Sequence, residues 1–224
     1  MTHKSHEQSH LADLLSDFAA NPSINPRNAV ALIQLRYRSL LQDTGIIRDV
    51  LRLAEAKGGP HSIRLPLVIH RFLYDSILGN AGQYRKADEP GNGNIKFGSR
   101  QIFDGTPPTQ IESEINIVFS ALHASDHDPI WRVAEFYQRF VQIHPFYDAN
   151  GRIGRAIVTA YLDLHGLYMN WENMEKNNKW LKRLNDCHKR YPRHEYATYL
   201  ERHVNHWRSF IEMKAAIYPE DEVF

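Results

Sequence analysis

Apolar residues recur every three or four positions through most of this chain, and this spacing limits how it can fold more than any other feature. The pattern is clear over residues 11–18 and again over residues 30–41. Residues three or four apart lie on one face of an α-helix, so each such segment has one apolar face to bury. Because neighbouring helices can bury these faces against each other, the sequence predicts an all-α helical bundle.

Proline and glycine divide the periodic pattern into separate helices. Asn-Pro pairs at 21–22 and 25–26, Thr44-Gly45 and Gly58-Gly59-Pro60 interrupt the first third of the chain, which is otherwise helical in pattern. Beyond it, we expect helices over residues 65–78, 108–124, 130–143, 150–164, 172–189 and 193–214.

Residues 79–108 do not follow the helical period. Glycines accumulate there, and residues 94–103 are rich in β-type side chains, which predicts one short exposed β-hairpin, called the flap below. No repeat or low-complexity linker interrupts the helices. We therefore expect an N-terminal helical region over residues 1–60, packed on a core domain over 61–214, and an acidic tail over 215–224.

Composition excludes several classes of function. The chain has 224 residues and a net charge of +1 from 27 basic and 26 acidic side chains, so it lacks the overall positive field of a protein that binds nucleic acid or anionic lipid. Cys187 is the only cysteine, no apolar stretch reaches the roughly 18 residues that a membrane span needs, and the N-terminus is too polar for a signal peptide. These features predict a cytoplasmic protein with no nucleic-acid or membrane partner.

Residues 143–155 hold the densest group of polar side chains, Ile-His-Pro-Phe-Tyr-Asp-Ala-Asn-Gly-Arg-Ile-Gly-Arg. Proline disfavours helical geometry in the residue before it, so His144 ends one helix and the Asp-Ala-Asn-Gly turn begins the next. The first N–H groups of a helix lack acceptors within it, and the helix dipole favours an anion there. Because Arg152 and Arg155 share one face of that helix and guanidinium groups suit phosphate oxygens, the segment predicts a polyphosphate site.

Two further side chains of this segment suit the chemistry of a bound nucleotide. Asp148 offers the hard oxygen ligand that Mg²⁺ prefers, and Mg²⁺ commonly binds through one or two carboxylates plus the phosphates of a nucleotide. His144 is the only proton acceptor of suitable pKa in the segment, so it is the candidate to deprotonate an incoming hydroxyl.

The run from His144 to Arg155 strongly resembles the signature of Fic-domain proteins, His-Pro-Phe-x-Asp/Glu-Gly-Asn-Gly-Arg-x-x-Arg. The similarity extends upstream to Ile69-His-Arg-Phe-Leu73 and Ala81-Gly-Gln-Tyr-Arg85, and covers roughly residues 65–200. Members of this family share a mainly helical fold and usually transfer AMP from ATP to a hydroxyl side chain of a protein. The resemblance therefore implies a protein adenylyltransferase with ATP as co-substrate, Mg²⁺ as cofactor and a Ser, Thr or Tyr hydroxyl as acceptor.

The resemblance also implies a role for individual residues. His144 is the general base, Asp148 the Mg²⁺ ligand, Asn150, Gly151, Arg152 and Arg155 bind the phosphates, and Ile95, Lys96 and Phe97 of the flap dock the backbone of the target. Two residues depart from the family pattern: Ala149 stands where glycine is usual, and Asn80 where tryptophan often precedes Ala-Gly. If position 149 needs a positive φ, alanine costs more there than glycine.

Three functions remain open at this stage. Gly151-Arg152 stands where the related Doc-type kinases resemble Asn-Lys-Arg, which favours nucleotidyl transfer. The alternatives are a phosphotransferase that uses another phosphate-containing donor and a catalytically silent interaction module. The remaining histidines, among them His188 and His203, have no spacing typical of a metal site.

Regulation follows from one sequence motif. Many Fic proteins are restrained by a helix resembling [S/T]-x-x-x-E-[G/N], whose glutamate pairs with the second arginine of the signature. No Ser or Thr of this chain is followed by Glu four residues later. We therefore expect Arg155 to be open to phosphate, and the chain to be either active alone or restrained by a separate antitoxin-like partner, by homo-oligomerisation or by the N-terminal helices.

Overall fold

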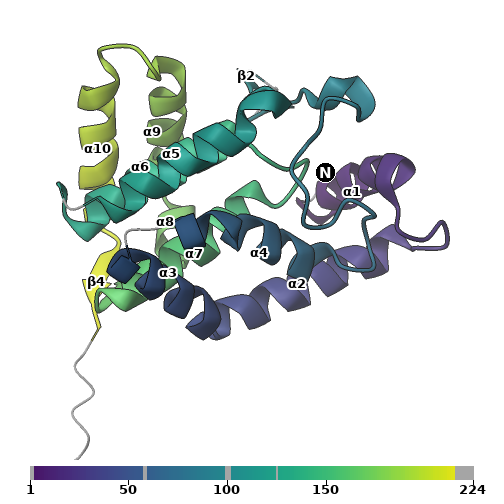
Figure 1. Ribbon diagram of the computed structural model, residues 1–224, viewed down its shortest axis with the longest axis horizontal. Coiled ribbons are helices and arrows are strands. Elements are labelled where there is room, and N and C mark those ends of the chain that lie inside the picture. Colours follow the sequence, from purple (N-terminus) through teal and green to yellow (C-terminus); the bar gives the residue numbers. More distant parts are fainter. Residues whose placement is uncertain (1–2, 58–59, 99–101, 125, 215–224) are drawn as a thin grey trace, which may run out of the picture.

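The computed structural model describes residues 3–57, 60–98, 102–124 and 126–214, and within them the fold is mostly helical, as the sequence predicts (Figure 1). The helices are α1 (His3–Phe18), α2 (Pro26–Gln42), α3 (Gly45–Lys57), α4 (Leu65–Tyr74), α5 (Ile111–His123), α6 (Pro129–Ile143), α7 (Asn150–Leu164), α8 (Trp171–Lys176), α9 (Asn178–Arg190) and α10 (Tyr196–Arg208). Short 3-10 turns span Pro60–Arg64, Pro90–Gly93 and Pro108–Gln110. The strands are β1 (Lys96–Phe97), β2 (Phe103–Asp104), β3 (Leu167–Met169) and β4 (Ile211–Met213).

Helix α7 is the centre of the core. Ile153, Ile157 and Tyr161 have no exposed surface, and the helix contacts α3, α4 and α6 on different sides. A helix that is apolar on most of its circumference must be covered on most sides, and α7 is. Since the signature segment begins this helix, its first turn is attached to the buried core of the molecule.

The N-terminal helices pack on this core. Leu11 of α1, Ile33 of α2 and Leu51 of α3 belong to the same buried cluster as α7. Asn25 caps α2 by accepting from the main-chain N–H of Arg27 at 2.9 Å, which is typical of asparagine before a helix. Figure 1 shows α1 at one end of the molecule and the pair α9 and α10 side by side at the other.

Three predicted helices differ from the periodic pattern in where they begin, where they end or whether they are continuous. The helix expected over 65–78 ends at Tyr74, and the one expected over 108–124 starts as a 3-10 turn. The helix expected over 172–189 is two helices, because Asn177 ends α8 and its side chain caps α9 by accepting from Lys179 N–H at 3.0 Å.

The segment 193–214, expected to be one helix, ends in a strand. Strand β4 pairs antiparallel with β3, with Met169 opposite Ile211, so the described residues contain two small sheets rather than the single predicted hairpin. The pairing joins segments more than 40 residues apart in sequence, which a local pattern cannot predict.

The predicted flap is a two-stranded hairpin. Lys96 pairs with Asp104 and Phe97 with Phe103, and Gly98 takes a φ of 81° that favours glycine. Residues 99–101 at its tip lie outside the described residues, as does the acidic tail over 215–224. Within the described part of the chain, no helix has the length and apolar character to cross a membrane.

Candidate active site

The loop between α6 and α7 is held by two residues in the left-handed region. His144 has φ 52° and Ala149 has φ 65°, so position 149 does take the positive φ at which alanine costs more than glycine. This conformation costs a non-glycine residue about 1–2 kcal/mol. The side chain of Asn150 stabilises this conformation by accepting from Phe146 N–H at 3.0 Å and donating to the Phe146 carbonyl at 2.8 Å.

This use of Asn150 changes how the predicted phosphate site would work. Its side chain is buried and bonded within the loop, so any anion contact from this residue comes from the main chain. Ala149 provides no side-chain cap for α7, a 15-residue helix, and main-chain N–H groups at a helix start suit an anion. Gly151 lies in that first turn with no Cβ to crowd an approaching anion.

His144 is held in the form that a base needs. Its Nδ1 lies 3.1 Å from the Val141 carbonyl, which can only accept, so Nδ1 carries the proton and Nε2 has the lone pair. The pKa of His144 is lowered to about 4, mainly by burial; the bond to Val141 raises it in part, and the positive charge of Arg85 contributes to the lowering. The imidazole is therefore neutral near pH 7.

Arg85 links the loop to the base of the flap. Its guanidinium donates to the carbonyls of His144 at 2.9 Å, of Thr106 at 2.8 Å and of Gly93, while its own N–H donates to Pro145. Only 2% of the residue is exposed, and burial lowers its pKa. Because these hydrogen bonds reach both segments, Arg85 sets the position of His144 relative to the flap.

Asp148 lies in a polar group that includes Tyr74 and Arg152. One carboxylate oxygen accepts from the Tyr74 hydroxyl at 2.5 Å and lies 3.6 Å from Arg152, and the other accepts from Ala149 N–H at 2.6 Å. Burial raises the pKa of Asp148, but Arg152 and these hydrogen bonds outweigh it, and the net shift is downward. The carboxylate is therefore ionised at neutral pH and suited to a cation.

The donor set fits the magnesium that the family resemblance implies. Among the described residues, no group of three or more His, Cys, Asp or Glu side chains could hold a metal ion by itself. Mg²⁺ does not need such a cage, since it commonly binds one or two carboxylates together with substrate phosphates and water. Asp148, beside the first turn of α7, meets that requirement with a single side chain.

Arg155 is not open, in contrast to the expectation from the motif scan. Its guanidinium forms an ion pair with Glu175 of α8 and lies 5.6 Å from the centre of the Trp171 ring. Burial acts to lower the pKa of Arg155, but nearby Tyr137, Tyr37 and Glu175 raise it overall. The scan missed Glu175 because this glutamate reaches the arginine from another helix, without the sequence motif.

The flap covers His144 on one face. Phe97 is buried and its ring is stacked on the imidazole at 4.5 Å between centres, with 19° between the planes. Lys96 points outward and pairs with Asp104 at 2.9 Å, and the carbonyl of Ile95 accepts from Gly105 N–H. Stacking leaves the in-plane Nε2 lone pair of His144 available, so Phe97 fixes the ring without using its basic atom.

His188 of α9 also contacts the flap, although its spacing gave no reason to single it out. Its ring meets the edges of Phe97 and Phe103 at 5.5 and 5.2 Å between centres, and its Nδ1 lies 3.1 Å from Gln138 Nε2. Burial lowers its pKa to about 3. Like Tyr74 and Arg85, it comes from outside the signature segment, and only Arg85 belonged to a run with a recognised resemblance.

A small hollow beside Asp148 is bounded by α1 and α2. It has a volume of about 70 Å³, which is less than the roughly 300 Å³ of the smaller ligand pockets. Its lining residues are His10, Leu11, Val30, Ile33, Gln34, Asp148 and Arg152. The N-terminal helices therefore restrict the space on this side of the site.

Part of this chain is similar to a known protein family. Residues 62–162 match the model of the Fic/DOC family. No curated protein matches the sequence.

Several solved structures share the fold. One is a Fic domain containing signaling protein from Bacteroides thetaiotaomicron, with TM-score 0.58 and 16% identity over 92% of this chain and 80% of that chain. A Fic family protein from Desulfovibrio desulfuricans has TM-score 0.50 and 16% identity over 93% of this chain and 65% of that chain. The N-terminal Fic domain of a VirB-translocated Bep effector protein from Bartonella quintana, with bound ADP, has TM-score 0.52 and 15% identity over 86% and 89%.

Proposed function

Since residues 62–162 of this chain belong to the Fic/DOC family, we propose that it is a protein adenylyltransferase that moves AMP from ATP to a hydroxyl side chain of a target protein. The main support is the state of His144, a neutral imidazole whose Nδ1–H is held by Val141 and whose Nε2 is unprotonated. The ADP bound by the Bartonella domain supports an adenine nucleotide as the donor.

In this proposal, His144 takes the proton of the target hydroxyl as its oxygen attacks the α-phosphorus of ATP. A new oxygen–phosphorus bond forms, the bond from the α-phosphorus to the bridging oxygen breaks, and pyrophosphate leaves with that electron pair. Arg85 and Phe97 hold the imidazole during this step, one through the His144 carbonyl and the other through its ring face.

The first turn of α7 would stabilise the negative charge of the phosphates. Its main-chain N–H groups and the guanidinium of Arg152 would face the phosphates of a nucleotide bound beside Asp148. When bound at Asp148, Mg²⁺ would neutralise charge on the phosphates and the leaving group. Tyr74 keeps the carboxylate in place by donating to one of its oxygens.

Labelled ATP distinguishes this function from its two alternatives. The purified chain, Mg²⁺ and ATP labelled at either the α- or the γ-phosphate would be incubated with lysate proteins, and labelled proteins identified by mass spectrometry. Transfer of the α-label, lost in His144→Ala, is the expected result. Transfer of the γ-label would instead show a phosphotransferase, and no transfer of either label would favour a silent interaction module.

A further inference from the structure

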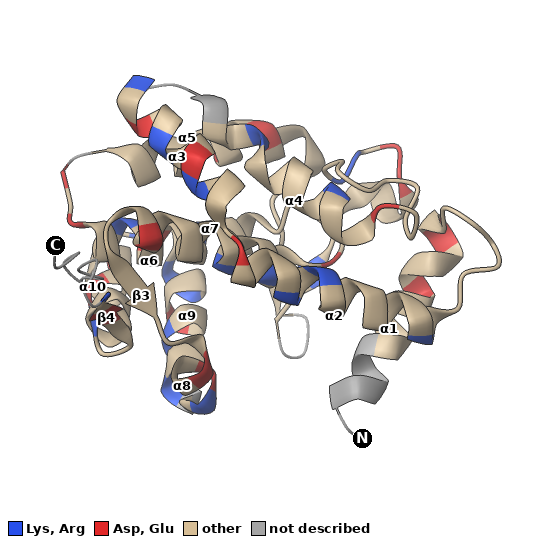
Figure 2. Ribbon diagram, turned by 90° about the horizontal axis from the view of Figure 1, so that it is seen from below, with Lys and Arg blue, Asp and Glu red and all other residues tan. Residues whose placement is uncertain are grey.

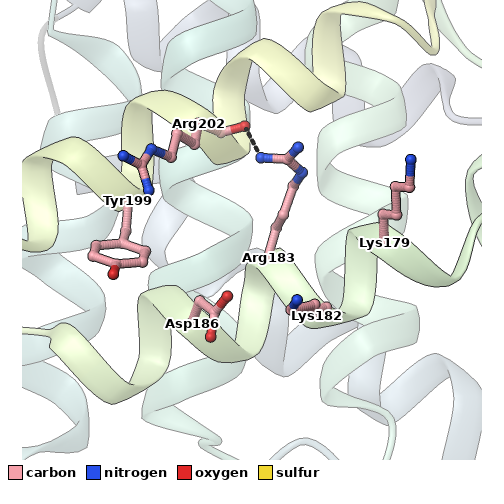
Figure 3. Close-up of a pocket in the computed structure, with 6 residues that line it drawn as sticks. All are labelled: Lys179, Lys182, Arg183, Asp186, Tyr199 and Arg202. Carbon is pink, nitrogen blue, oxygen red and sulfur yellow. Dashed lines mark hydrogen bonds between the residues drawn. The ribbon is translucent and has the colours of Figure 1, made fainter.

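A groove lined by basic side chains runs between α9 and α10, at the far end of the molecule from α1 (Figures 1 and 3). It has a volume of about 260 Å³, larger than the hollow beside Asp148. Its lining residues are Lys179, Lys182, Arg183 and Asp186 of α9, and Tyr199 and Arg202 of α10. None of these residues takes part in the proposed active site.

The positive charge of the groove is not neutralised by the protein itself. Among the described residues, no ion pair involves Lys179, Lys182 or Arg183, whereas basic residues elsewhere, such as Arg48 and Arg208, pair with Asp163 and Asp128. Figure 2 shows basic and acidic residues together on helices such as α3 and α8, and the chain as a whole has a net charge of +1. A local group of four cations with one carboxylate is therefore a departure from the rest of the surface.

His206 lies close enough to the groove for its positive charge to affect the pKa of the imidazole. His206 lies on the same face of α10 as Arg202, one turn further on. Its pKa is lowered first by burial and then by Arg183 and Lys179, and its Nε2 is buried without a hydrogen-bond partner. Arg183 is held across the groove by donating to the Arg202 carbonyl at 3.2 Å, so at least one cation has a fixed position (Figure 3).

We propose that this groove binds an acidic segment of a partner protein, with Asp and Glu side chains against Lys179, Lys182, Arg183 and Arg202. Lys179, Lys182 and Arg183 follow the i, i+3, i+4 spacing and form a stripe along α9. Such a stripe suits acidic side chains that alternate along an extended or helical segment. This surface is independent of the proposed transfer reaction.

Nucleic acid fits the groove less well. Single strands bind through free aromatic faces as well as phosphates, and the only aromatic residue of the groove is Tyr199. Its ring is already covered by the guanidinium groups of Arg190 at 3.8 Å and Arg202 at 5.4 Å. Asp186 would also repel a continuous row of phosphates, whereas a protein segment can place a Lys or a hydroxyl opposite it.

Binding of a defined probe tests this proposal. Fluorescence anisotropy would follow a labelled peptide of about twelve alternating Glu and Ser residues titrated with the full chain at low salt. The double substitution Lys179→Glu with Lys182→Glu should weaken binding about tenfold or more, because two attractions become repulsions. The matched control, Arg38→Glu with Lys57→Glu, changes the net charge equally on α2 and α3, outside the groove, and should bind as the wild type does.

Removing the negative charge of the groove tests whether peptide affinity changes in the opposite direction. Asp186→Asn should strengthen peptide binding about twofold to fivefold by removing a repulsion, whereas Asp13→Asn on α1 should not. Shifts of the His206 ring signals on adding the peptide would place it at the groove. No peptide binding, equal loss in the control pair, or tighter binding of an oligothymidine of similar charge would overturn the proposal.

Discussion

Replacing Glu175 by glutamine should strengthen binding of ATP to the isolated chain. In the structure Glu175 occupies the guanidinium of Arg155, the residue that the family resemblance assigns to a phosphate. A phosphate and this carboxylate compete for the same donors. Glutamine has the same shape and no charge, so the substitution removes the competitor and leaves the packing of α8 unchanged.

The structure limits how large this effect can be. The side chains of Arg155 and Glu175 are 25% and 46% exposed, so the pair is partly screened by water. Exposed ion pairs contribute about 0.2–1 kcal/mol, which corresponds to at most about a fivefold gain in affinity when the pair no longer has to break. Trp171 remains beside the guanidinium and keeps it oriented after the substitution.

Calorimetry with Mg-ATP and the purified variants measures the gain. The control is Glu172→Gln on the same helix, since Glu172 pairs with Lys176 and not with Arg155. In an Arg155→Ala background, Glu175→Gln should not change ATP affinity, because the guanidinium that Glu175 pairs with is absent. Unchanged or weaker ATP binding in Glu175→Gln would show that Arg155 does not bind phosphate, and a gain of a hundredfold or more would show that Glu175 restrains more than one ion pair.

Four other predictions follow from the site and the core. His144→Ala should reduce transfer to a protein target about 10²- to 10⁴-fold and leave ATP binding nearly unchanged, as rate assays and calorimetry would show. Asp148→Asn should abolish the dependence of nucleotide binding on Mg²⁺, measured by titrating the metal. Ala149→Val should destabilise the fold by at least about 1 kcal/mol in urea unfolding, because a β-branched residue is strained at φ 65°. His203 is fully buried with its pKa lowered to about 3, so the unfolded chain takes up a proton near pH 6.5 that the folded chain does not. Stability should therefore fall as the pH decreases from about 6.5 toward 3, by about 1 kcal/mol per pH unit, and thermal melts of wild type and His203→Phe would show a weaker dependence in the variant.

The helices that position the site could be predicted almost to the residue. The expected segments 130–143 and 150–164 correspond to α6 (Pro129–Ile143) and α7 (Asn150–Leu164). Both boundaries carry strong local signals: Asp128 caps α6 before a proline, and His144 precedes another. Where local signals and periodicity agree, the sequence alone is sufficient.

The C-terminal third was predicted less well because local and periodic signals disagree there. The apolar period continues through residues 172–189, but the side chain of Asn177 caps a new helix and divides the segment. Strand β4 depends on a distant partner, β3, whose main-chain groups it pairs with. Neither outcome can be derived from the apolar period of the segment itself.

In the candidate site, too, local sequence identifies some residues and only the packing of the chain identifies others. The side chains of the signature are contiguous in sequence, so the residues from His144 to Arg155 could be assigned together. Tyr74, Arg85 and Glu175 act on them from other helices and loops, and only the packing of the chain brings them near. Sequence therefore groups the residues of the signature, but it does not show which residues from other segments contact them.

The N-terminal helices α1 and α2 pack on the core and also border the candidate site. A nucleotide beside Asp148 needs more room than the 70 Å³ that the structure leaves there, and all the lining residues outside the signature belong to α1 and α2. Leu11 of α1 borders that hollow and is itself 2% exposed within the hydrophobic core, while Phe18 packs on Tyr147 at 4.9 Å between ring centres. Enlarging the hollow on this side therefore requires α1 or α2 to shift and to expose apolar surface, at about 1.5–3 kcal/mol for each large side chain. Under the proposed function, that free energy would be subtracted from nucleotide affinity, so the packing of these two helices, as well as Glu175, would determine how tightly the site binds.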